Sequence, residues 1–356
     1  MKQISKKGYR GKEVSKRDAV YVGLDVHKRS IYMAIRINGK EVGTKSLTAD
    51  WEAVVKVLAP YRAGLKKVVY EAGPTGFGLA RRLREEGYPL DVIAPHKTPR
   101  VSQFETKSDR LDCSKLAEYA EKELLKAVAI PTLQEEADRQ VVRLRNAMVE
   151  QKRKAKQRIK SFFLQYGLKT PRGLDYWTHE AIGILREMEL PPALRFTLDR
   201  LLEDLFYFDR QLKDVNIRLR VMMKEKAYEK KAKILRTHPG VGEVTTLQVL
   251  TEIYQPERFE NAKQVAAYVG LAPRIRQSGE TRKEGHLQKA GKGTLRATLV
   301  EAAWSWIQKD TQAYRVFRRF VRNTGHVNKA IVAMAHKLLI HLWTMLVRKE
   351  VYRPML

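Results

Sequence analysis

Alternating hydrophobic and polar positions predict a series of strands in the first third of the chain. Apolar runs at residues 21–26 and 31–37 flank a short polar segment, and Asn38-Gly39 marks a tight turn into a third strand at residues 41–47. Helical patterns and short strands then alternate, at residues 51–58, 67–70, 77–83 and 90–94. Three antiparallel strands followed by β/α units predict an α/β domain with a mixed sheet.

The middle of the chain carries a heptad pattern, typical of a coiled coil. Apolar residues recur at alternating spacings of three and four: Leu198, Leu201, Leu205, Phe208, Leu212, Val215, Leu219 and Met222. An earlier helix repeats the rhythm at Ala137, Val141, Leu144 and Met148, and turn residues between 167 and 192 predict that the two helices fold back on each other. The pattern fits a hairpin within one chain and also a dimer arm.

The last part of the chain opens on a possible phosphate-binding turn. His238-Pro239-Gly240-Val241-Gly242, followed by a helical pattern at residues 245–253, is similar to a helix-hairpin-helix, in which backbone N–H groups at Gly240 and Gly242 would contact a phosphate. We therefore predict four parts: a basic flexible arm at residues 1–17, an α/β domain at 18–127, a helical coiled-coil region at 128–232, and a mainly helical domain at 233–356.

Charge indicates the class of partner. The formal net charge is +29, and cations in such surplus repel one another until a polyanion neutralises them. Nucleic acid is the leading candidate, because binding releases the counterions of its phosphates; an anionic membrane surface or a ribosomal location is the alternative.

Cysteine content and hydropathy bear on location. The only cysteine, Cys113, excludes an internal disulfide and fits a cytoplasmic protein. The first 17 residues lack the apolar core of a secretory signal. The most apolar stretch, residues 330–347, is interrupted by His336, Lys337 and His341, which predicts a buried helix and no membrane partner.

Four acids carry the most informative chemistry. Asp25 and Glu71 each end a predicted strand, whereas Asp109 and Asp112 begin a helix, where their spacing puts both on one face that continues through Leu116, Ala120 and Leu124. That apolar continuation predicts that the two acids point inward, which is costly unless a cation neutralises them. Each acid alone could merely end an element or favour a helix dipole. Together, in a chain of this charge, they predict a site for two Mg²⁺ ions, which prefer oxygen ligands and act on a phosphate jointly.

A serine in a basic segment is the candidate nucleophile. Ser278 lies in residues 270–279, and the cations around it are Arg274, Arg276, Arg282, Lys283, Lys289, Lys292 and Arg296. Nearby positive charge would stabilise an alkoxide and the developing charge on a phosphate. The plain alternative is an ordinary Ser-Gly turn. A second basic cluster, Lys152, Arg153, Lys154 and Lys156, lies on the helix at the start of the coiled-coil region.

The order of these motifs resembles one known family. Residues 21–28, Tyr70-Glu71-Ala72 and residues 107–112 resemble the RuvC-like (RNase H-like) DEDD domain of the insertion-sequence one-ten transposases. Residues 235–242, 268–273, 277–279 and 289–291 look like the serine-bearing C-terminal domain of the same family. The resemblance runs from Val20 to Leu346; one departure is that Lys292 follows Gly291 where Asn is expected, which affects a loop contact.

The resemblance implies a mechanism and partners. Members of this family are recombinases guided by a bridge RNA that base-pairs with donor and target DNA. The resemblance implies that Asp25, Glu71, Asp109 and Asp112 bind Mg²⁺ and that Ser278 forms a covalent phosphoserine link to DNA. It also implies a homo-oligomer, a dimer that becomes a tetramer in the synaptic complex, in which the acids of one protomer meet the serine of another.

Two other functions remain open from the residues alone. A RuvC-like junction resolvase or nuclease that uses water would need the four acids but neither Ser278 nor the coiled coil. A non-catalytic protein that packages RNA or DNA would suit the charge but leaves the four acids without a purpose.

Overall fold

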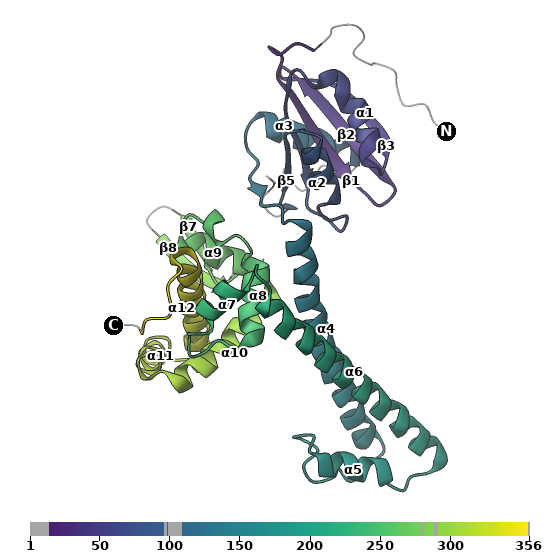
Figure 1. Cartoon of the computed structure of the whole chain (residues 1–356), viewed down its shortest axis with the longest axis vertical. Helices are drawn as coiled ribbons and strands as arrows, with labels where there is room; N and C mark the ends of the chain where they lie inside the picture. Colours follow the sequence, from purple (N-terminus) through teal and green to yellow (C-terminus); the bar gives the residue numbers. More distant parts are fainter. Residues whose placement is uncertain (1–13, 96–97, 99–108, 279–280, 288–290, 355–356) are drawn as a thin grey trace. The chain divides into compact units, whose positions relative to one another are not determined.

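The computed structural model describes residues 14–95, 98, 109–278, 281–287 and 291–354; the side chains of residues 109, 110, 273–278 and 281–286 lie outside this description. The chain divides into two compact units, Met1–Thr132 and Leu133–Leu356 (Figure 1). Each unit is considered by itself.

The first unit is built on a mixed sheet of order β3-β2-β1-β4-β5-β6. β1 (Val20–Val26), β2 (Ser30–Ile37) and β3 (Lys40–Thr48) form antiparallel pairs. β4 (Leu65–Glu71) and β5 (Leu90–Ile93) continue the sheet in parallel, and the short β6 (Ala127–Val128) closes it. Between β2 and β3, Asn38 and Gly39 both have positive φ, as a two-residue hairpin turn requires. The expected α/β class with a mixed sheet is confirmed.

Alternation along the strands gives the sheet two different faces. Val22, Leu24 and Tyr70 belong to a core that also contains residues of α1 (Trp51–Leu58) and α2 (Gly78–Glu85). On the opposite face, Val69 packs with residues of α3 (Asp109–Glu121). The sheet therefore lies between two helical layers, and odd-numbered positions of β1 and β4 face α3.

The second unit contains a long helical hairpin. α4 (Leu133–Gln165) packs along α6 (Pro192–Lys224), and α5 (His179–Glu187) lies between them in sequence. Leu198, Leu205, Val215, Leu219 and Met222 of the heptad pattern are buried in α6. The pattern is thus satisfied by a partner helix of the same chain.

The matching pattern predicted for the earlier helix is wrong at Ala137 and Leu144, whereas Val141 is partly buried against the core. Leu144 is 48% exposed and Ala137 is exposed, whereas Val142, Ala155, Ile159 and Phe163 are buried. The alignment of α4 on α6 selects a different stripe from the one with the strictest heptad spacing.

The rest of the second unit is a helical domain with one two-stranded sheet. Its elements are α7 (Glu229–Leu235), α8 (Glu243–Ile253), α9 (Ala262–Val269), β7 (Pro273–Ser278), β8 (Thr281–Leu287), α10 (Gly293–Lys309), α11 (Thr311–Thr324) and α12 (Val327–Arg348). Among the described residues, α12 is the one helix long and apolar enough to cross a membrane. Its Ile331, Leu338 and Leu342 are buried in the core of the domain, where the sequence pattern predicted a buried helix.

Candidate active site

Two carboxylates end neighbouring parallel strands on the same face of the sheet. Leu24 of β1 pairs with Tyr70 of β4, and Asp25 and Glu71 are the residues that come directly after this pair. Gly23 and Val69, two residues earlier, lie on the face that α3 covers. Since side chains alternate between faces, Asp25 and Glu71 belong to this same face. The register and the pleat bring together the two acids that the sequence placed at separate strand ends.

Gly23 allows α3 to approach this edge closely. A β carbon on Gly23 would lie 2.1 Å from the carbonyl oxygen of Cys113 and 2.6 Å from the amide nitrogen of Ala117. Any side chain would therefore push α3 away from β1. Burial, and secondarily the negative charge of Asp25, raise the pKa of the Cys113 thiol to about 12. The electrostatic effect indicates that Asp25 lies near the first turns of α3.

The last turn of α3 is hydrogen-bonded near the other end of β1, away from Asp25. Glu121 accepts a hydrogen bond from the backbone N–H of Gly39 at 2.7 Å and one from Arg36 Nε at 2.8 Å. The last turn of α3 is therefore fixed beside the β2–β3 turn, near the start of β1. Its first turn, which contains Asp109 and Asp112, lies toward the strand ends that carry Asp25 and Glu71.

The carboxylates have local partners. Asp25 Oδ2 lies 3.1 Å from His27 Nε2, and Thr98 Oγ1 donates to Glu71 Oε1 at 2.6 Å. The sequence reasoning missed His27 and Thr98. For His27 a signal existed, since it lies two residues after Asp25, whereas Thr98 is distant in sequence.

The expected inward stripe on α3 needs correction. Leu116 and Ala120 are buried, but Leu124 lies beyond the end of the helix and is 53% exposed. Asp112 is exposed, and the side chain of Asp109 lies outside the described residues. Because α3 ends before Leu124, this residue does not continue the apolar face. It therefore gives no evidence that Asp109 and Asp112 point inward.

The donor chemistry of this edge fits a hard cation. Carboxylate oxygens of Asp25 and Glu71 are the ligand type that Mg²⁺ prefers, and the exposed Asp112 lies at the adjoining helix end. Among the described residues, no three His, Cys, Asp or Glu side chains already form a cluster that could hold a metal. The chemistry fits Mg²⁺, but the described side chains are not gathered as they would be around an ion.

Ser278 is the last residue of β7, next to the turn of a hairpin. The register pairs Ser278 with Thr281, Gln277 with Arg282, and Arg276 with Lys283. Of the cations expected around the serine, Arg274, Arg276, Arg282 and Lys283 thus belong to this hairpin, and Lys289 lies outside the described residues.

Gly270 and Gly291 allow the end of α9 and the segment before α10 to approach each other closely. A β carbon on Gly291 would lie 2.7 Å from the amide nitrogen of Gly270, which ends α9 with a φ of 80°. Arg296 Nη1 donates to the carbonyl oxygen of Gly270 at 3.4 Å. Gly270 and Gly291 therefore lie in contact although they are not close in sequence.

A buried acid fixes Lys292 beside this loop. Glu252 of α8 is 3% exposed, and its carboxylate lies 3.5 Å from Lys292 Nζ and 3.2 Å from Arg143 Nε. Arg139 Nε is 3.9 Å away and also donates to the carbonyl oxygen of Thr251. The sequence did not predict a role for Glu252, because its partners Arg139 and Arg143 are more than 100 residues away in α4.

Comparison with known proteins decides the family. Residues 232–318 match the domain described as Transposase IS116/IS110/IS902 family, and residues 22–167 match the DEDD transposase domain of IS110 elements. A protein of Sinorhizobium fredii named as transposase y4qE is 31% identical over 309 residues, which cover 83% of this chain and 74% of that protein. The chain belongs to the IS110/IS116/IS902 family of insertion-sequence transposases.

Other relatives agree with this membership. The transposase for insertion sequence element IS1111A of Coxiella burnetii is 25% identical over 347 residues, 95% of this chain and 93% of that protein. A pilin gene-inverting protein of Moraxella bovis is 33% identical over 114 residues, 31% of this chain and 34% of that protein. Transposases cut and recombine DNA, so the family accounts for a chain with a net charge of +29.

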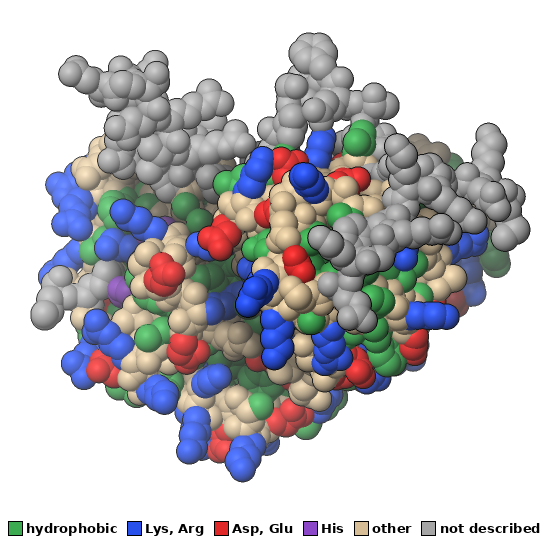
Figure 2. Space-filling model, turned by 90° about the horizontal axis from the view of Figure 1, so that it is seen from above, with side chains coloured by type: hydrophobic (Ala, Val, Ile, Leu, Met, Phe, Trp, Pro, Cys, Tyr) green, Lys and Arg blue, Asp and Glu red, His purple; other side chains and the backbone are tan. Residues whose placement is uncertain are grey.

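Some Lys and Arg side chains of this transposase form ion pairs within the chain and others do not. Figure 2 shows Lys and Arg side chains across the viewed face. In the basic cluster of α4, Lys152 pairs with Asp209, Arg153 pairs with Glu150, and Lys156 lies over the ring of Trp177. Lys154 is exposed and forms no ion pair with the described residues. Most of this cluster is therefore already engaged within the hairpin.

The expected phosphate contact at Gly240 is not supported. Gly240 is buried, its N–H lies 3.3 Å from His238 Nδ1, and a β carbon there would be 2.6 Å from the carbonyl oxygen of Ala302. Its glycine allows the turn to pack on α10. Gly242 is exposed at the start of α8, but Glu243 follows it and pairs with Arg220 and Arg236. An acid at this helix end reduces its attraction for a phosphate.

Proposed function

We propose that this transposase breaks and rejoins DNA strands through Ser278, assisted by Mg²⁺ bound at Asp25, Glu71, Asp109 and Asp112. The observation that supports the proposal is the strand register, which puts Asp25 and Glu71 on the face of the sheet that α3 covers. A packaging protein has no use for such an arrangement. The position of Ser278 at the tip of a hairpin that contains four cations supports its role as nucleophile.

The proposed chemistry exchanges one phosphodiester for another. The hydroxyl oxygen of Ser278 attacks the phosphorus of the DNA backbone, and the bond from phosphorus to the leaving strand breaks. The serine proton ends on the oxygen of that strand, which leaves with a free hydroxyl. A hydroxyl of a new strand then attacks the phosphoserine and releases Ser278 with its proton restored. The bond energy is conserved, so no outside energy source is needed.

The site residues divide the work between them. Bound Mg²⁺ would neutralise the phosphate and stabilise the attacking and leaving oxygens. Lys292 and Arg296 lie beside the base of the hairpin and would attract the backbone phosphates. His27 would orient Asp25, and Thr98 would orient Glu71.

A serine replacement tests the proposal. Ser278→Ala should bind DNA normally but form no covalent protein–DNA adduct and exchange no strands. Thr281→Ala is the matched control, since it removes the hydroxyl across the hairpin, and it should keep both activities. Protein trapped by denaturant during the reaction should carry DNA on the peptide that contains Ser278. Free, unlinked DNA ends from both wild type and Ser278→Ala would instead indicate a nuclease that uses water.

We also propose that an RNA guide selects the DNA sites, as the family resemblance implies. Exposed cations without a pattern of base-reading side chains, such as Lys154, suit recognition of phosphates and shape. RNA that co-purifies with the protein should contain segments complementary to both DNA sites. Replacing these segments should redirect recombination, and an unchanged DNA site would contradict the guide.

Self-association is proposed for the helical hairpin. Its outer surface exposes Leu144, Val149 and Leu164 of α4 and Tyr207 and Ile217 of α6, although the heptad pattern itself is satisfied internally. These exposed apolar side chains are the ones that a second protomer would cover. Such a dimer, and a tetramer in the synaptic complex, would allow the acids of one protomer to meet Ser278 of another.

A further inference from the structure

α11 presents one face made almost entirely of arginine. Arg315, Arg318, Arg319 and Arg322 follow the i, i+3, i+4, i+7 spacing that lines one side of a helix, and all four are exposed. The helix contains no acid. Arg318, Arg319 and Arg322 form no ion pair with the described residues, unlike most cations of α4. The face runs about 10 Å along the helix, and its charge is complementary to a polyanion.

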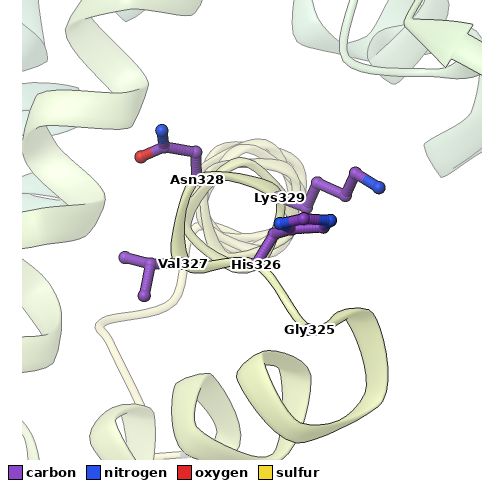
Figure 3. A pocket seen from close by; sticks show the side chains of 5 residues that line it. All are labelled: Gly325, His326, Val327, Asn328 and Lys329. Carbon is purple, nitrogen blue, oxygen red and sulfur yellow. The ribbon is translucent and has the colours of Figure 1, made fainter.

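The cationic surface continues past the end of α11. Gly325, with a φ of 67°, ends the helix, and the chain turns into α12 around a hollow of about 380 Å³ lined by residues 325–329. Figure 3 shows His326 and Lys329 on the same side of the start of α12. Arg319, Arg322 and Lys329 lie beyond the residues that match the transposase family domain.

An aromatic pocket adjoins the arginine face. It has a volume of about 540 Å³ and lies at the corner between α10 and α11, with Trp304, Tyr314 and Phe317 among its lining residues. Trp304 is 37% and Tyr314 45% exposed, whereas Phe317 is buried and packs edge-on against Trp304 with ring centres 5.7 Å apart. Pockets that bind small organic groups have volumes of this order.

The pocket and the arginine face are continuous. Tyr314 and Arg318 are four residues apart, so they are neighbours on the helix surface. Asp310 also lines the pocket, but its carboxylate accepts hydrogen bonds from the backbone of Gln312 and Ala313 and from the hydroxyl of Tyr352. The acid is thus bound to its own helix end, and Lys309 beside it adds positive charge.

We propose that this corner of α10 and α11 binds single-stranded DNA, with an unpaired base stacked on Tyr314 and Trp304 and the adjoining phosphates on the arginines. Exposed aromatic rings can stack on a base only when it has left the duplex, and arginines that follow the backbone supply the remaining attraction. The inference rests on the proposed recombinase function for the identity of the polymer, because strand exchange separates DNA strands. It does not depend on Ser278, on Mg²⁺ or on an RNA guide.

Binding of short labelled oligonucleotides tests the aromatic part. Fluorescence anisotropy of the full chain with a single-stranded oligothymidine should show that Tyr314→Leu binds about tenfold more weakly, within the range for loss of one stacked base. Tyr314→Phe keeps the ring and should bind like wild type. An abasic oligonucleotide of the same length should bind wild type and Tyr314→Leu equally. Tyr314 is 45% exposed and is not one of the buried core residues, so neither variant removes a core side chain.

A charge-matched pair of variants tests the arginine face. The triple variant Arg315→Ala, Arg318→Ala, Arg322→Ala should reduce the salt dependence of oligothymidine binding by roughly 0.7 in the log–log slope for each phosphate that it no longer neutralises. The control triple variant Lys226→Ala, Lys230→Ala, Lys231→Ala also removes three exposed positive charges and should change the slope much less.

Three results would overturn the inference. Tyr314→Leu could bind oligothymidine as tightly as wild type, or oligouridine could compete at lower concentration than oligothymidine, which would assign the surface to RNA. Loss of self-association in sedimentation by the arginine variant, with oligothymidine binding unchanged, would assign it to a second protomer. Ser278→Ala should bind oligothymidine normally, so failure of the proposed catalysis leaves a distinct result.

Discussion

Gly23 lies so close to Cys113 that a single β carbon would be 2.1 Å from the Cys113 carbonyl oxygen. The close approach joins the central strand of the sheet to the helix that begins with Asp109 and Asp112, so it bears on both the fold and the geometry of the carboxylates.

Gly23→Ala should destabilise the protein by about 3 kcal/mol, because backbone atoms of α3 cannot move aside as a flexible side chain can. Strand cleavage should fall further than stability alone explains, since α3 would shift from Asp25. Gly43→Ala is the control, because a β carbon at Gly43 in β3 meets no atom within 4 Å. Urea unfolding and a cleavage assay measure both effects; equal behaviour of the two variants would contradict the close packing.

Asp25→Asn and Glu71→Gln should each abolish strand cleavage while leaving nucleic-acid binding nearly unchanged. The substitutions keep the size of the side chain but remove the charge that would hold Mg²⁺, whereas binding depends on the net charge of +29. Asp91→Asn, which removes another acid of the same sheet that pairs with Lys67 and Arg84, should keep cleavage. Cleavage that persists in an Asp25→Asn, Glu71→Gln double variant would rule out the carboxylate site.

Glu252→Gln should lower the free energy of unfolding by about 3 kcal/mol, because it leaves the buried Arg139 without its counter-charge. It should also weaken DNA binding by Lys292, whose position depends on this carboxylate. Glu257→Gln, at an exposed acid shortly after the end of α8, is a suitable control. Chemical denaturation and DNA titration of both variants check the prediction. Equal free energies of unfolding for Glu252→Gln and Glu257→Gln would show that Glu252 does not stabilise Arg139.

His238 should make the fold sensitive to acid. The ring is 1% exposed and contacts the rings of Trp306 and Tyr352. Burial, and secondarily the nearby His341, lower the pKa of His238 from 6.5 to about 3. The unfolded chain therefore binds a proton between pH 6.5 and 3 that the folded chain does not. Stability falls as the pH drops through this window, by about 1.4 kcal/mol per pH unit from this group.

A substitution at His238 isolates this contribution. His238→Phe should flatten the pH dependence of unfolding below pH 6.5, because phenylalanine cannot take up a proton. His341, whose pKa is also lowered by burial, should retain part of the slope. Identical pH profiles of wild type and His238→Phe would contradict a neutral buried ring.

The helical hairpin separates internal packing from self-association. Leu205→Asp should unfold the hairpin, because Leu205 is 3% exposed within the core that α4, α5 and α6 share. Leu144→Glu with Ile217→Glu should keep the helices folded but weaken self-association, because both side chains are exposed at the level where Arg145 pairs with Asn216. Circular dichroism and sedimentation velocity distinguish the two. An unchanged oligomer in the Leu144, Ile217 variant would assign any assembly to another surface.

Local patterns in the sequence were enough to predict β1 to β5 and the acids at the ends of β1 and β4, but not the two-residue β6. Alternating burial follows directly from the period of a strand, and Asn38-Gly39 has the residues that tolerate positive φ, so residues 20–48 could be predicted well from local rules. The heptad pattern of α6 likewise showed that a partner helix exists. Periodicity cannot say to which chain that helix belongs, and α4 was found to supply it with a different stripe from the one expected.

Packing in three dimensions settled which distant residues meet. The parallel register set Asp25 beside Glu71, and the missing β carbon of Gly23 brought α3 onto their face. The sequence around Gly240 fits a phosphate-binding turn, but in the fold α10 packs against this glycine. Glu252 had no local signal, since its partners Arg139 and Arg143 lie in another helix more than 100 residues away. Short-range patterns record the period and the turns of the chain, whereas contacts of this kind depend on packing between elements, which no local pattern contains.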